Sequence, residues 1–432
     1  MKNKFLFISA ALLALLLASN CKNKNKDTET FECVNSNFIN TLTLQLTPTY
    51  VEEGSKGNIL VLGHFDQLVK IAKFDTQGEL LWQKEYPQLQ GKEQGLVYID
   101  ENAFFIKTST NHYEYELSAN GYENIWKKNS NMLDANNNYI PTYELYSGRP
   151  KLQLPNSNKT YLSKISTDGA VLWTKEFKGD ACNGNSFFRI DNNNFLFLTS
   201  EFWGHYYELI EHNGIADTVN YPNDRNRRTV YKIDNNGEVI WSTEIENIFN
   251  VNWDPGGDYS HGFQHSITQS NDRITVNTLN NTYELSASGE LVKSYQPAFN
   301  FQGNWTFFME RATETENYFF GEKHTANSVL AERYLLKYNL VSQQTTWEKM
   351  NAQFPLQLSS YPNKGFISSF YGIPFTIKKF DNDGQELWQT EVENSWGTLV
   401  IKAACNGGAI IAKYDNEKEE FILIKTNENG EY

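Results

Sequence analysis

The sequence predicts an all-β protein built as a single β-propeller of eight four-stranded blades, with seven blades as the alternative. One motif recurs along most of the chain, and short apolar runs precede most of its copies. None of these runs shows the 3.6-residue period of an amphipathic helix. Aromatic residues make up 14% of the 432 residues and only 4 residues are Met, a balance that suits pleated surfaces better than long helices.

The repeated motif reads Lys, apolar, Asp or Ser, two polar residues, Gly, three residues, Trp. Its four clearest copies are KFDTQGELLWQKEY (73–86), KISTDGAVLWTKEF (164–177), KIDNNGEVIWSTEI (232–245) and KFDNDGQELWQTEV (379–392). Weaker copies at 116–126, 284–293, 337–347 and 425–432 bring the total to eight. Periods of roughly 40 to 50 residues are typical of propeller blades, so each copy predicts one blade.

Each copy predicts two strands joined by a tight turn. Apolar residues alternate up to the Asp or Ser and predict one strand, and the Trp lies on the next strand. The Asp or Asn side chain bonds back to the turn backbone, and the Gly supplies a positive φ. Upstream runs such as NILVLGHF and FLFLTSEF predict the remaining strands. The unit therefore has the strand content of a propeller blade.

The two ends of the chain are predicted to close the ring together. The last copy stops at Tyr432, where an outermost strand would begin, and residues 40–47 alternate as an edge strand would. We expect this segment to complete the last blade, because an open ring would expose strand edges. Cys33 and Cys405 are expected near the same face of that blade, where a disulfide would fasten the closure. Cys182 is expected on the opposite face and unpaired.

The pattern Asp-x-x-Gly-x-x-x-Trp, as in Asp75, Gly78 and Trp82, resembles the tryptophan-docking repeat of pyrroloquinoline-quinone-type propellers, with a turn one residue shorter. The resemblance covers most of residues 48–432 and implies eight blades with Trp wedged between neighbours. It does not imply the quinone, because this chain has no adjacent cysteines and no convincing calcium loop. The chain looks more like the non-enzymatic branch, which includes the propeller lipoprotein of the outer-membrane assembly machinery. We predict no cofactor.

The N-terminus predicts export followed by lipid anchoring. Residues 1–20 combine a positively charged start with an apolar stretch that is too short to span a bilayer comfortably. Cys21 follows a segment that resembles the lipobox of bacterial lipoproteins, and an ordinary secreted protein is the alternative. Residues 21–37 would form a flexible tether and residues 38–432 the propeller. The expected location is the bacterial cell envelope, at the outer membrane, with the side of that membrane left open.

The charge balance excludes one class of partner. The chain has 52 acidic and 38 basic side chains, a net charge of −14. Binding to phosphate backbones requires a basic face, so we do not expect nucleic acid as a partner. Anionic lipid would not attract such a chain either, so the membrane is expected to hold it through the lipid anchor only.

The candidate binding residues lie in two long segments of the face opposite the uniform turns. These segments are the insertion from about Phe202 to Arg228, expected in the fourth blade, and Asn247–Gly262, the expected entry to the fifth. Aromatic rings beside Arg and Asp would grip a peptide or a sugar. The alternative is a loop that packs its own aromatic side chains. The candidate residues are Trp203, His205, Tyr207, Arg225, Arg227, Trp253, Asp254, Asp258 and His261.

The sequence predicts a binding or scaffolding module that acts through this long-loop face, with a protein or a glycan as partner. One alternative is an enzyme acting on glycans or sulfate esters, either a hydrolase or an arylsulfotransferase-like propeller. Another is a purely structural envelope component. His261 and His265 have the spacing of metal ligands only on a helix, and the segment around them reads as the entry to a strand, so no metal site is predicted.

Overall fold

We describe the protein from a computed structural model, which confirms an all-β β-propeller. The structure describes residues 33–66, 68–89, 92–100, 103–110, 116–117, 151–153, 159–181, 187–191, 193–203, 206–212, 215–220, 225–249, 266–270, 273–277, 282–295, 304–311, 316–324, 332–339, 342, 344–350, 355–361, 364–370, 372, 374–393 and 397–432. Within these ranges, no helix is long and apolar enough to cross a membrane.

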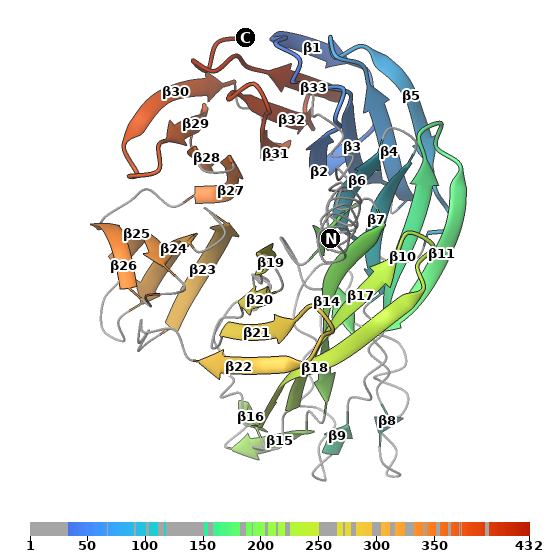
Figure 1. Ribbon diagram of the computed structural model, residues 1–432, viewed down its shortest axis with the longest axis vertical. Helices are drawn as coiled ribbons and strands as arrows, with labels where there is room; N and C mark the ends of the chain where they lie inside the picture. Colours follow the sequence, from blue (N-terminus) through green and yellow to red (C-terminus); the bar gives the residue numbers. More distant parts are fainter. Residues whose placement is uncertain are drawn as a thin grey trace, which may run out of the picture.

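Antiparallel four-stranded sheets follow one another around a common axis (Figure 1). The first blade contains β2 (Thr47–Glu53), β3 (Ile59–Phe65), β4 (Leu68–Phe74) and β5 (Leu80–Glu85). The second contains β6 (Lys92–Asp100), β7 (Ala103–Thr110), β10 (Lys159–Ser166) and β11 (Val171–Lys178). The third contains β12 (Asp180–Ala181), β13 (Phe187–Arg189), β14 (Asn194–Trp203), β17 (Arg225–Asp234) and β18 (Val239–Phe249).

The remaining blades repeat the same order. The fourth contains β19 (Ser266–Ser270), β20 (Arg273–Asn277), β21 (Thr282–Ser286) and β22 (Leu291–Tyr295). The fifth contains β23 (Asn304–Arg311), β24 (Glu316–His324), β25 (Glu332–Asn339) and β26 (Gln344–Met350). The sixth contains β27 (Pro355–Tyr361), β28 (Gly365–Phe370), β29 (Phe375–Phe380) and β30 (Glu386–Val392). The seventh contains β31 (Gly397–Ala403), β32 (Ala409–Asp415), β33 (Glu420–Lys425) and the N-terminal β1 (Phe38–Leu42).

The described part of the chain therefore forms seven blades, not the eight that the motif count predicts. The copy at 116–126 does not supply a blade of its own. Its first residues form β8 (Glu116–Leu117), which lies within the connection between β7 and β10 and pairs only with β9 (Lys151–Gln153). The second blade thus carries a long insertion that contains this copy.

The apolar runs that precede each motif are buried on both faces. Alternate residues of β3 point to opposite neighbours: Ile59 and Val61 pack between the first and seventh blades, whereas Leu60 and Leu62 pack between the first and second. In the described residues, every pair of neighbouring blades except the fourth and fifth shares such an apolar cluster. Burial on both faces explains why these strands read as continuous apolar runs.

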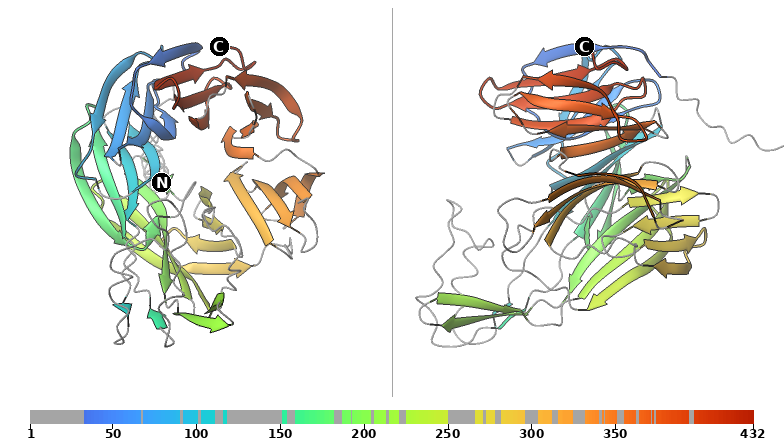
Figure 2. Two further views of the ribbon diagram at one scale, coloured as in Figure 1. Left: turned by 180° about the vertical axis from the view of Figure 1, so that it is seen from behind. Right: turned by 90° about the vertical axis from the view of Figure 1, so that its left-hand side faces the viewer.

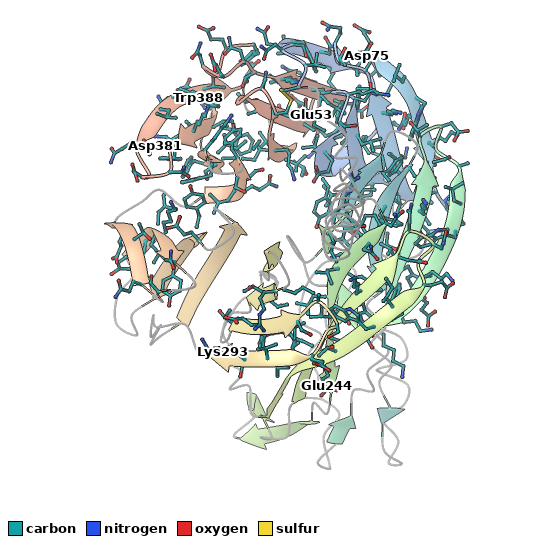
Figure 3. All side chains as sticks on the ribbon, viewed as in Figure 1. Glu53, Asp75, Glu244, Lys293, Asp381 and Trp388 are labelled. Carbon is teal, nitrogen blue, oxygen red and sulfur yellow. A yellow bond between two sulfur atoms is a disulfide. The ribbon has the colours of Figure 1, made fainter. Side chains whose placement is uncertain are left out.

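The repeated turns form as the motif predicts. In the first blade, Asp75 Oδ1 accepts hydrogen bonds from the backbone N–H groups of Gln77 (2.8 Å) and Glu79 (2.9 Å), and Gly78 has φ +78°. The turns that begin at Asp234, Asp381 and Asn427 repeat these bonds. Figure 3 shows Asp75, Asp381 and Trp388 towards the outside of the ring.

Lys and Trp of one motif bind the turn of the following blade. Trp82 Nε1 donates to the carbonyl oxygen of Thr167 (3.0 Å), and Lys73 Nζ donates to the same oxygen (3.4 Å). Trp388 and Lys379 bind Glu428, the equivalent residue of the seventh blade, in the same way, at 2.7 and 3.4 Å. The motif is therefore a blade-to-blade connector as well as a turn.

The N-terminal strand completes the seventh blade. β1 pairs antiparallel with β33, from Phe38 opposite Lys425 to Leu42 opposite Phe421. The strand begins at Phe38 and ends at Leu42, so only the first part of the predicted segment 40–47 belongs to it. Leu44 and Leu46 are buried between the seventh and first blades.

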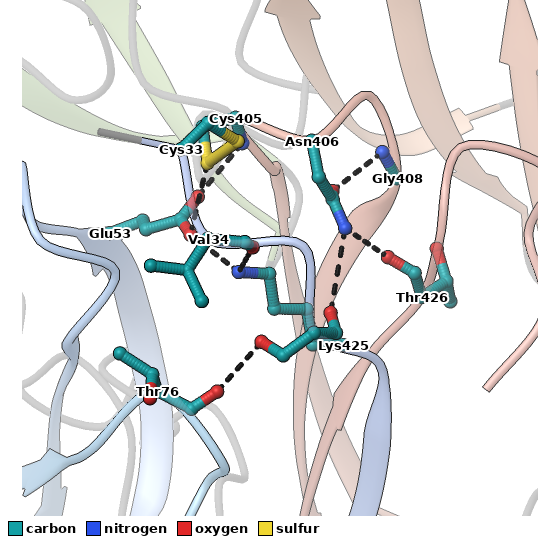
Figure 4. Close-up of a disulfide and its surroundings, with 10 residues drawn as sticks. Cys33, Val34, Glu53, Thr76, Cys405, Asn406, Gly408, Lys425 and Thr426 are labelled. Carbon is teal, nitrogen blue, oxygen red and sulfur yellow. Dashed lines mark hydrogen bonds and ion pairs between the residues drawn. A yellow bond between two sulfur atoms is a disulfide. The ribbon is translucent and has the colours of Figure 1, made fainter. Parts of the chain in front are cut away.

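A disulfide and a buried ion pair lie beside this strand (Figure 4). Cys33 and Cys405 are joined, with their Cα atoms 5.5 Å apart. Glu53 accepts a hydrogen bond from the backbone N–H of Cys405 at 2.8 Å and pairs with Lys425 Nζ at 2.7 Å. Lys425 Nζ also donates to the carbonyl oxygen of Val34 (3.1 Å). The fixed part of the chain therefore extends to Cys33, within the segment expected to be a tether.

Candidate functional site

The two faces of the ring differ in construction. In the third blade, Asn194 lies opposite Asp234 beside the repeated turn, and Trp203 lies opposite Arg225 at the other end of the same strand pair. In the second blade, Ala103 lies opposite Ser166 beside the turn, and Thr110 lies opposite Lys159 at the far end. The insertions of both blades therefore leave from the face opposite the repeated turns, which we call the insertion face.

The two insertions pair with each other beyond the ring. β9 of the second-blade insertion pairs with β15 (Tyr206–His212) of the third-blade insertion, with Leu152 opposite Tyr207. β8 and β16 (Ile215–Asn220) complete a separate sheet in the order β16-β15-β9-β8. Figure 2 shows this accessory sheet apart from the blades, at one end of the molecule. The paired strands β9 and β15 are more than 50 residues apart in the sequence.

The structure brings several predicted binding residues to this face. Trp203 ends β14 and faces Arg225, the first residue of β17. Arg227 lies two residues further along β17, opposite Glu201. Tyr207 lies on β15, in the accessory sheet, between Leu152 and Asn220 of the neighbouring strands.

The other predicted residues are not part of the described chain. His205 lies in the connection between β14 and β15, and Trp253, Asp254, Asp258 and His261 precede the fourth blade; all five lie outside the described residues. The same holds for Cys182 and for the lipidation candidate Cys21. Because the motif at 116–126 is not a blade, these segments belong to the third and fourth blades, not to the fourth and fifth as expected.

Buried cationic side chains lie in the same halves of the second and third blades. Lys107, near the end of β7, is 2% exposed, and Arg228, near the start of β17, is 1% exposed. Arg228, at the approximate end of the predicted insertion, lies opposite Ser200 within the blade. Both cations are therefore fixed parts of the scaffold below the insertion face. In the described residues, no group of three or more His, Cys, Asp or Glu side chains could hold a metal ion.

The insertion of the second blade is the part of this face that the motif analysis misses. ELSANG at 116–121 and ELSASG at 284–289 differ at one position, yet Glu116 and Leu117 of the first form β8 of the accessory sheet, whereas the second belongs to a blade turn. Spacing does not separate the two cases. Gly78 and Gly169 are 91 residues apart across one insertion, and Gly289 and Gly384 are 95 residues apart across a complete blade. No feature of the sequence alone distinguishes them.

Comparison with known proteins gives a limited result. No protein-family model matches the chain, and no curated protein matches it in sequence. Among solved structures, the chain is similar to the WD40 domain of Neurospora crassa Pan2, with a TM-score of 0.46 and 10% sequence identity over 89% of this chain and 92% of that one. A similarity at this level carries no argument about function.

Proposed function

We propose that the protein is a lipid-anchored propeller of the bacterial cell envelope that binds a protein or glycan partner through its insertion face. The anchoring part rests on the export signal in residues 1–20 and on Cys21. The binding part rests on the construction of the insertion face. A net charge of −14 disfavours nucleic acid as the partner.

The accessory sheet is the observation that supports binding most directly. Closing a blade requires only a short connection between its second and third strands, whereas β7 and β10 are separated by 48 residues, Asn111–Asn158. This insertion and the one in the third blade pair with each other on one side of the ring. Variable segments held on a rigid scaffold are where binding residues concentrate.

We infer further that the repeat is of the tryptophan-docking type found in pyrroloquinoline-quinone-type propellers. The contacts of Trp82, Trp241 and Trp388 with the turn of the next blade support this, because each indole N–H donates to a turn carbonyl. The non-enzymatic branch of that group agrees with a binding role. Assignment to the non-enzymatic branch would be wrong if the purified protein bound the quinone stoichiometrically.

A crosslinking experiment in cells tests the binding proposal. A photoreactive amino acid is placed at Tyr207 in the accessory sheet, and the control carries it at Asp383, an exposed residue of a repeated turn. We expect covalent adducts with a protein or a glycan from Tyr207 and far fewer from Asp383. Adducts concentrated at Asp383 would place the working surface on the opposite face and contradict the proposal.

Truncating two candidate aromatic residues then tests affinity. The double variant Trp203→Ala with Trp253→Ala should weaken binding to the crosslinked partner by on the order of 2 kcal/mol or more, as loss of aromatic anchors does. The melting temperature should change little. Trp388→Ala is the control, because Trp388 bonds to the seventh-blade turn and its loss should destabilise the fold. If the melting temperature of the double variant falls as far as that of Trp388→Ala, Trp203 and Trp253 are structural residues.

The anchor has its own test. Cys21→Ser should move the protein from the membrane fraction into the soluble envelope fraction, because the only lipidation site is removed. Unchanged membrane association would contradict lipid anchoring. Turnover of a glycan or sulfate ester by the purified protein would favour the enzymatic alternative instead.

A further inference from the structure

We propose that the face of the repeated turns lies on the lipid surface and that the insertion face points away from it, so that the partner is bound on the side remote from the membrane. The proposal rests on the lipid anchor of the proposed function. It concerns a different surface, however, which we call the turn face: the repeated turns and the adjoining ends of the outermost strands β5, β11, β18, β22, β30 and β1.

The first described residues, from Cys33 onwards, lie on the turn face. Ser36 Oγ donates to the carbonyl oxygen of Thr76, in the repeated turn of the first blade, at 2.7 Å. Asn406 Nδ2 donates at 3.0 Å to the carbonyl oxygen of Thr426, beside the last repeated turn. Cys405, the neighbour of Asn406, is bonded to Cys33. Cys33, the described residue nearest to Cys21 in the sequence, is therefore on the turn face.

The segment that begins at Cys33 is held firmly. Besides the disulfide, Lys425 binds the carbonyl oxygen of Val34, and the side chain of Val34 lies so close to Gly57 that a Cβ there would be 2.8 Å away. Lys425 is fully buried and paired with Glu53. A pull on the N-terminus is thus transmitted to Cys33 and Cys405, before it reaches the pairing of β1 with β33.

The tether is short compared with the height of the ring. Eleven residues lie between Cys21 and Cys33, and whatever their conformation the two cysteines are at most about 40 Å apart. The ten residues of β14 run from the turn face to the insertion face and span about 33 Å. To bring the accessory sheet to the bilayer, the segment between Cys21 and Cys33 would have to span more than the height of a blade, which requires an almost fully extended chain.

The exposed apolar side chains gather on the same side of the ring. In the described residues, the large apolar side chains that are 39–55% exposed lie next to the repeated turns or on β1: Ile39, Leu80, Leu81, Leu172, Val239, Ile240, Leu291, Val292, Leu387 and Tyr432. We call them the apolar rim. Half of them recur because the same β-bulge in each outermost strand leaves one residue opposite no residue of the neighbouring strand: Leu81, Leu172, Ile240, Val292 and Leu387. The apolar rim therefore recurs beside the repeated turns of the first four blades and of the sixth blade.

Charge selects the kind of lipid. The turn face also carries exposed acidic residues beside the rim, including Glu79, Glu290 and Asp383. These oppose an anionic surface, so the rim fits zwitterionic headgroups. Aliphatic side chains reach the boundary between headgroups and acyl chains, as those of interfacial helices do. In this arrangement the anchor supplies the affinity and the apolar rim sets the orientation.

Energy transfer measures the orientation on vesicles. The lipidated full chain is reconstituted on phosphatidylcholine vesicles that contain an acceptor-labelled lipid, with a donor dye on a non-natural residue at Leu80 or at Tyr207. We expect transfer from Leu80 to exceed that from Tyr207 by about twofold or more, because the two sites are separated by more than the height of a blade. Equal transfer, or more from Tyr207, would overturn the proposal. Protein that does not float with the vesicles would instead contradict the anchor.

A matched pair of variants tests the rim itself. Ile240→Lys, Val292→Lys and Leu387→Lys together alter the rim in three blades, and Ser242→Lys, Ser294→Lys and Gln389→Lys add the same charge two residues further along the same strands. All six residues are exposed, so both triple variants should fold. We expect the first variant to lose the difference between the two dye positions and the second to keep it. A difference that survives in both variants would overturn the role of the rim.

A second copy of the chain is the competing occupant. The Cys21→Ser protein, which lacks the anchor, is therefore examined by light scattering with and without the rim substitutions. We expect a monomer in both cases. A dimer that dissociates when Ile240, Val292 and Leu387 are replaced would assign the apolar rim to self-association and overturn the proposal.

Discussion

The second residue of each repeated turn is the point where neighbouring blades meet. In the turns of the second, fourth and seventh blades its carbonyl oxygen accepts the indole N–H of the preceding blade, as in the pair Trp241 and Ala287 at 3.2 Å. The turn glycine lies under the same indole: a Cβ at Gly289 would be 2.6 Å from the ring of Trp241. Glycine is therefore required at position 289 for two reasons: its φ is +88°, and the indole of Trp241 fills the space that a side chain would need.

These two requirements can be separated experimentally. Gly407 has φ +86°, but a Cβ there would meet its nearest neighbours at 3.5 Å. Gly407→Ala should therefore cost only the left-handed conformation, about 1–2 kcal/mol. Gly289→Ala should cost about 1–3 kcal/mol more, because the indole of Trp241 must move. Urea denaturation of both variants measures the difference in the free energy of unfolding. Equal losses in the two variants would show that the indole of Trp241 moves aside without cost.

At the scale of the element, residues of the N-terminal segment make at the first-blade turn the contacts that the Trp of the motif makes at other turns. Phe38 occupies the space beside Gly78 that an indole occupies beside Gly289, since a Cβ at Gly78 would be 2.2 Å from the Phe38 ring. Ser36 Oγ donates to the Thr76 carbonyl oxygen in place of an indole N–H. The seventh blade thus docks on the first through a two-residue substitute for Trp.

Phe38 and its neighbour Ile39 provide a matched test of this docking. Phe38→Ala should lower the free energy of unfolding by about 2 kcal/mol or more, because it empties the space beside Gly78. Ile39→Ala should cost much less, because Ile39 is 51% exposed. Chemical denaturation of both single variants measures the two losses in the free energy of unfolding. A loss at Ile39 as large as that at Phe38 would mean that strand pairing, and not docking, holds β1.

The disulfide should protect this one element more than the rest. Replacing both Cys33 and Cys405 with Ser removes the covalent hold on β1 while the pairing with β33 remains. We expect the amide hydrogens of β1 to exchange faster in this variant and those of β29 in the sixth blade to change little, since opening is local. Hydrogen exchange followed by mass spectrometry gives both rates. Equal acceleration in both strands would indicate that the disulfide stabilises the whole ring.

At the scale of the molecule, stability is distributed over the junctions between blades. Three buried tyrosines lie at three of these junctions. Tyr86 OH donates to Gly169 O (3.0 Å), Tyr318 OH to Asn382 Oδ1 (2.9 Å) and Tyr361 OH to Gly408 O (2.5 Å). Burial raises the pKa of all three, with the charges of Asp168 and Glu316 adding to the effect at Tyr86 and Tyr318 respectively.

The direction of these shifts predicts alkaline unfolding. A tyrosine whose pKa is raised in the folded state contributes stability that is fully present below its unfolded pKa of about 10 and is lost as the pH rises above it. The free energy of unfolding should therefore fall between about pH 10 and 12. Tyr361→Phe should be less stable at neutral pH, because its hydrogen bond is lost, but should show a shallower alkaline decline. Tyr432→Phe, at an exposed position, is the control and should keep the full decline.

The sequence by itself determined the repeating unit, because its causes are local. An Asp or Asn oxygen bonds to amides two and four residues ahead, Gly adopts a positive φ, and apolar residues alternate towards two faces, as at Asp75, Gly78 and Ile59. These interactions operate within a few residues of the chain. The all-β propeller and the turn at each blade followed from them.

Only the tertiary structure decided the number of blades and the surface that carries the candidate site. ELSANG at 116–121 and ELSASG at 284–289 offer the same local chemistry, but the described start of the first pairs in the accessory sheet, whereas the second forms a blade turn. The pairing of β9 with β15, and the docking of Phe38 at Gly78, join residues that are distant in the chain. Such contacts depend on how the remaining blades fill the ring, which no short motif encodes.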